Sequence, residues 1–325
     1  MSRQRMVFKW AERIADGEPL EQWEWERLVA WPKEAVWDLL PGAGLLRQNF
    51  CGTAIHLCTI SNAKSGGCTE NCGFCSQSQS ASGPVPIYPL ISPEEIVSVG
   101  EYAAAGGVHR FSAVTAGRGL PVSEVEAVAA GLGALRHSGI ERCASLGIVS
   151  EKALSVLRAA GVSRYHHNLE TARSYFPQVC TSHSYDERVQ TIQRAQAAGF
   201  SICSGGIFGC GESDAHVLEL GRELASLDAS AVPINFFVPI EGTALASRHS
   251  LTPLRCLKII ALLRLLLPDK ELIVCGGREH NLRELHPFIF QAGASGIMTG
   301  NYLTTSGRTL PQDLELLADL GLTVR

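Results

Sequence analysis

From residue 51 onwards, short apolar runs alternate with longer amphipathic stretches along the chain. The short runs have the length and composition of buried strands, and the longer stretches repeat apolar residues at helical spacing. Eight strands are predicted, over residues 55–60, 109–114, 142–146, 165–169, 201–205, 232–237, 272–275 and 296–298. Helices are predicted between them over residues 93–105, 122–137, 151–159, 186–198, 214–227 and 253–266.

Regular alternation of strands and helices is typical of a parallel sheet with right-handed crossovers. Eight such units can close into one barrel, whose active site lies at the carboxyl ends of the strands. An open, doubly wound sheet is the alternative, but no G-x-G-x-x-G motif follows the first strand. We therefore predict an α/β fold, a single (β/α)8 TIM-type barrel over residues 51–325.

Residues 1–50 have a different pattern and contain all five tryptophans. Trp25, Leu28 and Val29 have helical spacing, so we expect an N-terminal helical extension that packs on the base of the barrel. The aromatic residues are expected to be packing surface, because large aromatic side chains dominate the energetics of protein cores.

Composition and charge restrict the possible functions. The net charge of -4 gives no basic footprint for nucleic acid. The longest apolar run, 259–267, is interrupted by Arg264 and is too short to cross a bilayer, and the first residues lack the apolar stretch of a secretory signal. We expect a cytoplasmic protein with neither nucleic acid nor a membrane as partner. In a reducing compartment, eleven cysteines indicate metal or sulfur chemistry, although any one of them can be an inert core residue.

Three of these cysteines, Cys68, Cys72 and Cys75, lie within eight positions directly after the first predicted strand. One loop with this spacing can wrap three thiolates around an iron–sulfur cluster or a zinc ion. A structural zinc site requires four ligands, and no second pair of cysteines or histidines follows nearby. Three ligands leave one coordination position of a cluster open.

The spacing C-x3-C-x2-C, with Phe74 before the last cysteine, resembles the radical S-adenosylmethionine superfamily. The resemblance implies that Cys68, Cys72 and Cys75 hold a 4Fe-4S cluster, whose open iron binds S-adenosylmethionine, and that Phe74 lies beside the adenine. One electron from the cluster then cleaves the sulfonium and yields a deoxyadenosyl radical, which the barrel must shield from water.

Further motifs cover most of the predicted barrel: NAKSGG at 62–67, YHHNLET at 165–171, CSGGIFGCGE at 203–212, VPINFF at 232–237 and GGRE at 276–279. Together they resemble the biotin synthase family, which inserts sulfur into dethiobiotin.

The resemblance implies that Asn168 and Asn235 contact the ureido group of this substrate. It also implies that Asn168, Glu170 and Gly209 belong to the cofactor site, with Glu170 in place of a ribose-binding aspartate. Strand-end capping by the amides and a tight turn at the glycine are the alternatives. His166 and His167 are adjacent on a strand and must point to opposite faces, and we expect core or supporting roles for them.

The family's second cluster, whose sulfide becomes the biotin sulfur, is held by three cysteines and an arginine. Cys143 and Cys203 match two of these positions, whereas a serine (Ser112) and an isoleucine (Ile273) occupy the other two. Cysteines at new places are expected to face the same interior: Cys58, Cys275 and Cys180.

Cys58, Cys143, Cys203 and Cys275 could enclose one larger centre. This resembles a branch of the family from strict anaerobes with a 4Fe-5S cluster. For each cysteine, an inert core thiol remains the alternative.

Two other functions remain open from the sequence. A maturase or carbon-skeleton mutase would keep the radical cofactor and insert no sulfur, and a non-catalytic scaffold would use the triplet as a zinc clip. As partners, the resemblance implies a flavodoxin- or ferredoxin-type electron donor and the iron–sulfur assembly machinery. Homodimerisation is expected by analogy with the family.

Overall fold

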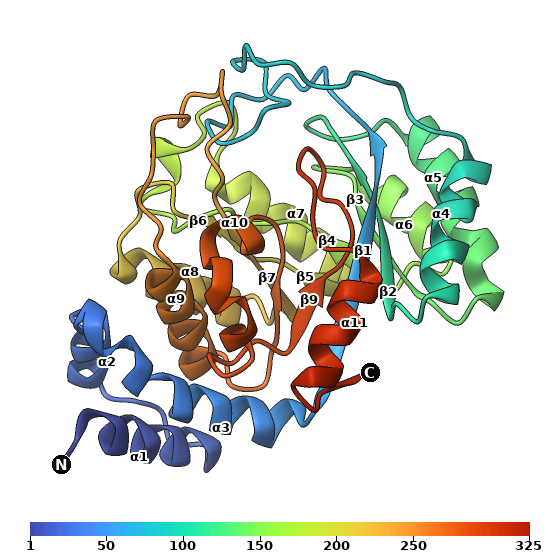
Figure 1. Cartoon of the computed structure of the whole chain (residues 1–325). Helices are drawn as coiled ribbons and strands as arrows, with labels where there is room; N and C mark the ends of the chain where they lie inside the picture. The colour runs from blue at the N-terminus through green and yellow to red at the C-terminus, as the bar shows by residue number, and fades with distance from the viewer.

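The computed structural model describes residues 1–325 and contains one closed parallel barrel (Figure 1). Pairing of β1 with β9 closes the ring, and every strand pair is parallel. The barrel strands are β1 (Ala54–Lys64), β2 (Arg110–Thr115), β3 (Glu141–Ser145), β4 (Arg164–His166), β5 (Ser201–Cys203), β7 (Ala231–Phe236), β8 (Glu271–Val274) and β9 (Gly296–Met298). The predicted single (β/α)8 barrel is confirmed.

Two short strands were not predicted. The strand expected over 201–205 ends at Cys203 as β5. A second short strand, β6 (Gly206–Phe208), follows it, and both pair with β7. Gly205 lies at the break, where a Cβ would lie 2.0 Å from the carbonyl oxygen of Pro233. At the other end of the barrel, β10 (Thr323–Val324) pairs with the start of β1.

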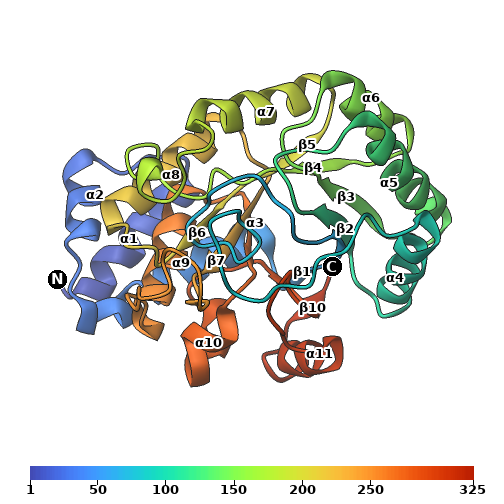
Figure 2. The same ribbon diagram turned by 90° about the horizontal axis from the view of Figure 1, so that it is seen from above.

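The barrel helices begin at well-defined N-caps. Serine or threonine side chains accept a backbone N–H at six of them, namely Ser92, Ser150, Ser184, Ser213, Thr252 and Thr309. The helices are α4 (Pro93–Ala105), α5 (Val122–Ala134), α6 (Glu151–Ala159), α7 (Tyr185–Ala197), α8 (Asp214–Ser226), α9 (Pro253–Leu266), α10 (Arg278–Leu282) and α11 (Leu310–Asp319). Figure 2 shows α4 to α8 in an arc on the outside of the strands. The helices α4, α6 and α9 match their predicted ranges to the residue, whereas the helix expected over 122–137 ends as a short 3-10 turn, η2 (Leu135–His137).

The N-terminal helices α1 (Arg3–Ala15), α2 (Gln22–Val29) and α3 (Leu40–Cys51) lie beneath the barrel in Figure 1. Trp10, Trp25 and Trp31 are buried, whereas Trp23 and Trp37 are exposed. One hydrophobic core contains residues of both the helical extension and the barrel. Three further 3-10 segments are η1 (Lys33–Asp38), η3 (Phe176–Gln178) and η4 (Arg283–Ile289).

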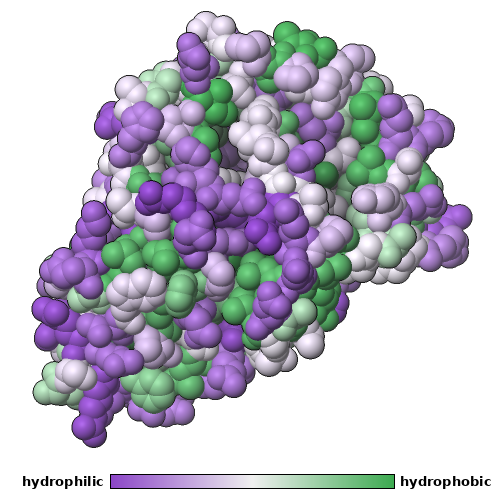
Figure 3. Space-filling view, in the orientation of Figure 1, coloured by the Kyte–Doolittle hydropathy of each residue, from purple (hydrophilic) through white to green (hydrophobic).

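The helix α9 is buried on every side, because α3 and η1 cover the face that would otherwise meet solvent. Its Lys258 ammonium donates to the carbonyl oxygens of Val29 and Trp31, so the charge is satisfied inside the interface. None of the helices combines the length and apolar character needed to span a bilayer. On the face shown in Figure 3, hydrophobic residues form separate patches around a hydrophilic band.

Candidate active site

A cavity of about 310 Å³ enters the barrel from the carboxyl ends of its strands. Its mouth is lined by residues 74–77 of the loop after β1 and by residues 302–305 of the loop after β9. Its floor is lined by His56, Arg110 and Arg164, which lie at the amino ends of β1, β2 and β4. Figure 1 shows the loop after β1 passing over the open end of the barrel. This is the end at which barrel enzymes carry their active sites.

The cysteine triplet lies in that loop. Gly66 and Gly67 adopt φ values of 75° and 62°, which turn the chain sharply before Cys68. The Gly73 N–H donates to the carbonyl oxygen of Val179 at 2.8 Å, which fixes the loop against the segment after η3. Of the triplet region, Phe74 and Cys75 line the cavity. Burial raises the pKa of Cys75 to about 11, so this thiol requires a metal to become a thiolate at neutral pH.

The sulfur spacing in the triplet does not match a single ion. A zinc ion with bonds of about 2.3 Å needs sulfur ligands within about 4.6 Å of one another. The only group of three ligand atoms that all lie within 4.8 Å consists of Glu70, Cys180 and His183, and the triplet is not such a group. The triplet by itself therefore does not form a compact single-ion site in this structure.

Cys180 does not face the barrel interior, so that expectation was wrong. It lies beyond η3, fourteen positions after the end of β4, and its Sγ is 3.7 Å from the Sγ of Cys72 in the triplet. The hydrogen bond with Cys180, together with burial, raises the pKa of Cys72. Cys180 therefore belongs to the surroundings of the triplet rather than to the inner cavity.

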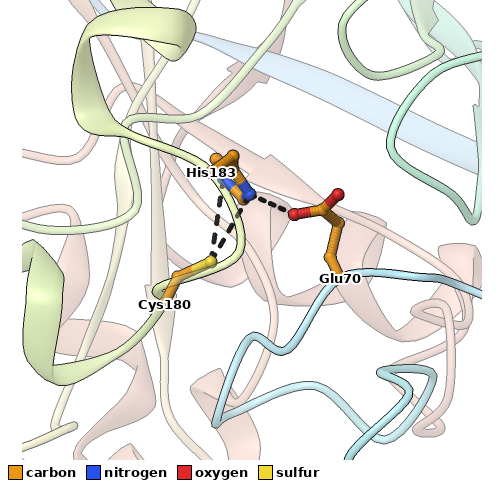
Figure 4. A group of neighbouring side chains, drawn as sticks. All are labelled: Glu70, Cys180 and His183. Carbon is orange, nitrogen blue, oxygen red and sulfur yellow. Dashed lines mark hydrogen bonds and ion pairs between the residues drawn. The ribbon is translucent and has the colours of Figure 1, made fainter.

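Figure 4 shows Cys180 grouped with Glu70 and His183. The His183 Nδ1 bonds to the Glu70 carboxylate and lies 3.4 Å from the Cys180 sulfur. The Arg188 Nε donates to the His183 Nε2 at 2.8 Å, and Arg118 pairs with Glu70 at 3.4 Å. The guanidinium groups of Arg188 and Arg118 already balance the negative charge of this group. We therefore interpret Glu70, Cys180 and His183 as a hydrogen-bonded network rather than a cation site.

The four cysteines predicted to surround a second centre all line the cavity: Cys58, Cys143, Cys203 and Cys275. We call this set the thiol chamber. Its members come from β1, β3, β5 and the residue after β8. Burial raises the pKa values of Cys143 and Cys203, and the positive charges of Arg110 and Arg164 oppose this effect.

Two residues that depart from the family's pattern lie in the same cavity as the thiol chamber. Ser112 and Ile273 line the same cavity. Cys203, Ile273 and Cys275 also pack as one buried group, with Cys58 against it. The side chain of Ile273 offers no ligand atom, whereas Cys275, two residues further on, does.

His166 and His167 point to opposite faces, as predicted. His166 lines the cavity, and its Nδ1 lies 3.2 Å from the Cys203 sulfur, whereas His167 is buried away from the cavity. Burial lowers the pKa of His166 to about 4, so the ring is neutral at pH 7. The supporting role expected for His166 agrees with this position beside a chamber thiol.

The two asparagines and Glu170 lie in the upper part of the cavity. The Asn168 Oδ1 accepts the Gly205 N–H at 3.1 Å, and its Nδ2 lies 3.4 Å from the Glu170 carboxylate. The Asn235 Oδ1 accepts the Gly276 N–H at 3.1 Å. Both amides therefore cap strand-end backbone, which was the alternative interpretation. Each still keeps unused hydrogen-bonding capacity toward the cavity.

Gly209 lies outside this cavity, so the expected contact with a cofactor receives no support. Its N–H donates to the Glu212 carboxylate at 2.8 Å, and its carbonyl oxygen accepts from the Ser250 hydroxyl. With a φ of 107°, Gly209 forms a tight connection between β6 and α8.

Comparisons with known proteins agree with this geometry. The Radical SAM superfamily model matches residues 63–224, and the Biotin and Thiamin Synthesis associated domain model matches residues 233–323. The "Biotin synthase" of Desulfatibacillum aliphaticivorans is 50% identical over 96% of this chain and 95% of its own. That of Geobacter sulfurreducens is 47% identical over 97% of this chain and 96% of its own. The chain belongs to the biotin synthase family.

As a member of the biotin synthase family, the protein is a radical SAM enzyme, and a 4Fe-4S cluster with S-adenosylmethionine is implied. Solved structures support the fold alone. Methylornithine synthase superimposes with a TM-score of 0.84 at 20% identity, over 97% of both chains. The FeFe-hydrogenase maturase HydG from Carboxydothermus hydrogenoformans gives 0.81 at 18% identity, over 98% of this chain and 79% of its own.

The residues of the candidate site are divided between the two family-model matches. The triplet, Cys143, Asn168 and Cys203 lie within residues 63–224, whereas Asn235 and Cys275 lie within residues 233–323. The barrel thus brings together groups from both matched regions.

The floor of the cavity was not predicted from the sequence. His56, Arg110 and Arg164 each stand two residues before an inward-facing residue, at Cys58, Ser112 and His166. The period-two rule for strands could have placed them inside the barrel.

Proposed function

We propose that this enzyme inserts sulfur into dethiobiotin to form biotin, with the sulfur supplied by an auxiliary iron–sulfur cluster in the thiol chamber. The observation that carries the proposal is the meeting of Cys58, Cys143, Cys203 and Cys275 in the cavity that Cys75 of the triplet also lines. Four thiols around one cavity are the ligands that an auxiliary cluster would require.

Cys68, Cys72 and Cys75 are the residues that would hold the 4Fe-4S cluster. When bound, this cluster supplies the electron that cleaves S-adenosylmethionine. Phe74 lies at the mouth beside Cys75, in a position to pack against an adenine.

Glu170 is positioned to accept hydrogen bonds from ribose hydroxyls. Its backbone has a φ of 71° and forms a bridge with Gly206, which aims the side chain at the cavity. The Arg188 Nη1 holds its Oε1 at 3.3 Å.

The thiol chamber has the donor set of a four-iron centre. Four thiols can hold either a 2Fe-2S or a four-iron cluster. We favour a 4Fe-5S cluster because these four positions resemble the branch of the family that has one. Arg110 and Arg164 face the same space and would compensate the negative charge of thiolates and sulfides. Replacement of the family's arginine ligand by Ile273 is then offset by Cys275, the residue directly after β8.

Asn168 and Asn235 would orient the ureido ring. The Asn235 Nδ2 uses one hydrogen on the carbonyl oxygen of Gly206, and its Oδ1 uses one lone pair on Gly276. One N–H and one lone pair remain, which is the complement of a ureido N–H and C=O. Because backbone contacts fix each amide, its orientation is set before the substrate binds.

The upper cavity is also suited to excluding water. Phe236, Phe237, Val238 and Ile240 line it beside the two amides. Apolar walls around the reacting C–H bonds protect a radical from side reactions. By family resemblance, we also propose a flavodoxin- or ferredoxin-type electron donor and the iron–sulfur assembly machinery as partners, and a homodimeric state.

The test starts from anaerobically reconstituted protein. Two four-iron clusters should give about eight irons per chain, with labile sulfide, whereas one cluster gives about four. Cys143→Ala should lose the auxiliary irons and keep the triplet's, and Cys210→Ala, a buried cysteine outside the cavity, is the matched control. Incubation with S-adenosylmethionine, dethiobiotin and a reduced donor should yield biotin by mass. About four irons in the wild type, or a product without new sulfur, would refute the proposal.

A further inference from the structure

The floor of the cavity carries polar atoms that have no partner. Both ring nitrogens of His56, the Nε of Arg110 and the Oγ of Ser112 are buried without a hydrogen bond. The three residues are 2%, 8% and 9% exposed. They lie on the paired strands β1 and β2, and all line the same cavity. Because buried polar groups are normally hydrogen-bonded, such a gathering of unpaired atoms indicates a ligand.

The charge of the floor indicates what that ligand is. Arg110 and Arg164 both line the cavity, and their carboxylate partners, Glu141 and Glu271, do not. Glu170 is the only carboxylate that lines the cavity, and it lies in the upper part. Both guanidinium charges are balanced by their carboxylate partners, but the Arg110 Nε–H and the Ser112 O–H remain free to donate, so the floor favours a small anion.

A second cavity, of about 550 Å³, lies at the opposite end of the barrel. We call it the basal cavity. It is lined by residues at the amino ends of strands, among them Ala54, Ser230 and Glu271. Asp228 and Arg325 at its rim have side chains 81% and 56% exposed, so it opens to solvent.

The two cavities share a wall, because His56 and Arg164 line both. Arg164 is held by Glu271 at 2.7 Å and by the Ser201 hydroxyl at 3.1 Å. The imidazole ring of His56 has no hydrogen bond. Its nearest polar neighbours are the Glu271 carboxylate, 3.8 Å from Nδ1, and the edge of the His109 ring. Rotation of the His56 ring would break no hydrogen bond, so His56 is the residue of the wall that we assign as the gate.

We propose that the basal cavity is a second entrance to the thiol chamber, and that hydrosulfide enters through it and binds on the floor beside His56, Arg110 and Ser112. This inference rests on the proposed function, in which each turnover removes a sulfide from the chamber. The upper mouth is then occupied by cofactor and substrate, so replacement from below requires neither to leave. Hydrosulfide sulfur has the same oxidation level as cluster sulfide, so the exchange needs no electrons. The incoming hydrosulfide gives its proton to water, and the sulfide that leaves the cluster takes up one proton and departs as hydrosulfide, so charge and protons balance.

The experiment uses reconstituted enzyme, first assayed for iron and labile sulfide, then incubated with sodium sulfide labelled with sulfur-34. No electron donor is added, so no turnover occurs. Incorporation of label into protein-bound sulfide is followed with and without saturating S-adenosylmethionine and dethiobiotin. In the wild type, the rate of labelling of the chamber should be unchanged when the mouth is filled.

Variants of the basal cavity provide the second arm. Ser230 lines this cavity, and its hydroxyl makes no hydrogen bond, so Ser230→Phe adds bulk without removing a contact. It should slow labelling at least tenfold. Ser230→Leu is a smaller plug in case the first variant folds poorly. Ser98→Phe, on the exposed surface of α4, is the matched control.

Two results would overturn the inference alone: labelling that stops when the mouth is filled, or plugged variants that label at the wild-type rate. A nitrogen hyperfine signal from His56 on the auxiliary cluster would also overturn it, since the ring would then be a ligand rather than a gate. About four irons in the starting protein would instead remove the auxiliary cluster and, with it, both proposals.

Discussion

A buried ion pair holds the C-terminal part of the barrel together, and its removal should be costly. Arg278, the first residue of α10, and Asp313, in α11, are both fully buried, with Nη2 and Oδ2 2.5 Å apart. The same guanidinium contacts His286 at 2.6 Å and the hydroxyl of Tyr302 at 3.2 Å. Tyr302 lines the mouth of the active-site cavity, so the pair also positions part of the site.

Asp313→Ala leaves the Arg278 charge buried and unpaired, which typically costs about 3–5 kcal/mol. An unfolding entropy of about 2.1 cal/mol/K per residue gives roughly 0.7 kcal/mol/K for 325 residues. The melting temperature should therefore fall by roughly 4–7 °C, as measured by circular dichroism on protein of equal iron content.

The double variant Arg278→Met/Asp313→Leu should recover much of this loss, because no charge remains unpaired. Arg308→Ala is the control. Arg308 also pairs with Asp313 but is 27% exposed, so its loss should cost less than about 1 kcal/mol. A fall of under about 1.5 °C for Asp313→Ala, or a double variant as unstable as the two single losses summed, would refute the reasoning.

Three further predictions concern the site and the base of the barrel. Asn235→Ala should weaken dethiobiotin binding at least tenfold in calorimetry while the iron content stays constant, and unchanged affinity would remove its assignment. Cys275→Ala should lose the auxiliary irons whereas Cys180→Ala should keep them, and the reverse order in iron analysis would return Cys180 to the ligand set. Burial alone would raise the pKa of Glu271, but the positive charge of Arg164 dominates and holds the pKa at about 2 instead of 4.5. Its stabilisation is therefore present above pH 4.5 and is lost as the pH falls toward 2, by roughly 1.4 kcal/mol at pH 3.5. Urea unfolding of wild type and Glu271→Gln should converge by that amount between pH 6 and pH 3.5, and parallel curves would contradict the pairing.

Much of the barrel could be predicted because strands and helices are local patterns. The range 93–105 combines the N-cap Ser92, a proline at the first turn and helical spacing, and α4 matches it to the residue. The break between β5 and β6 could not be predicted in this way. It depends on how closely the backbone at Gly205 approaches Pro233 on a strand that comes nearly thirty residues later.

The same distinction between local patterns and contacts of distant residues applies to the candidate site. Spacing alone was enough to place the triplet in one loop, and the resemblance to the family was enough to place Cys143 and Cys203 in the barrel interior. Cys180 was misplaced because it lies in a long loop, where no periodicity constrains which side of the barrel the chain reaches. The backbone partners of Asn168 and Asn235 could not be predicted either, because they belong to neighbouring strands and the residues that follow them.

The amino-acid sequence by itself determined the eightfold alternation and the cysteine loop, because each is a pattern of residues close together in the chain. Only the tertiary structure decided that four other cysteines share one chamber, that Cys180 lies beside Cys72 instead, and that His56 and Arg164 separate the chamber from the basal cavity. Those facts depend on the register and closure of the barrel, which set the level at which each strand presents its side chains to the others.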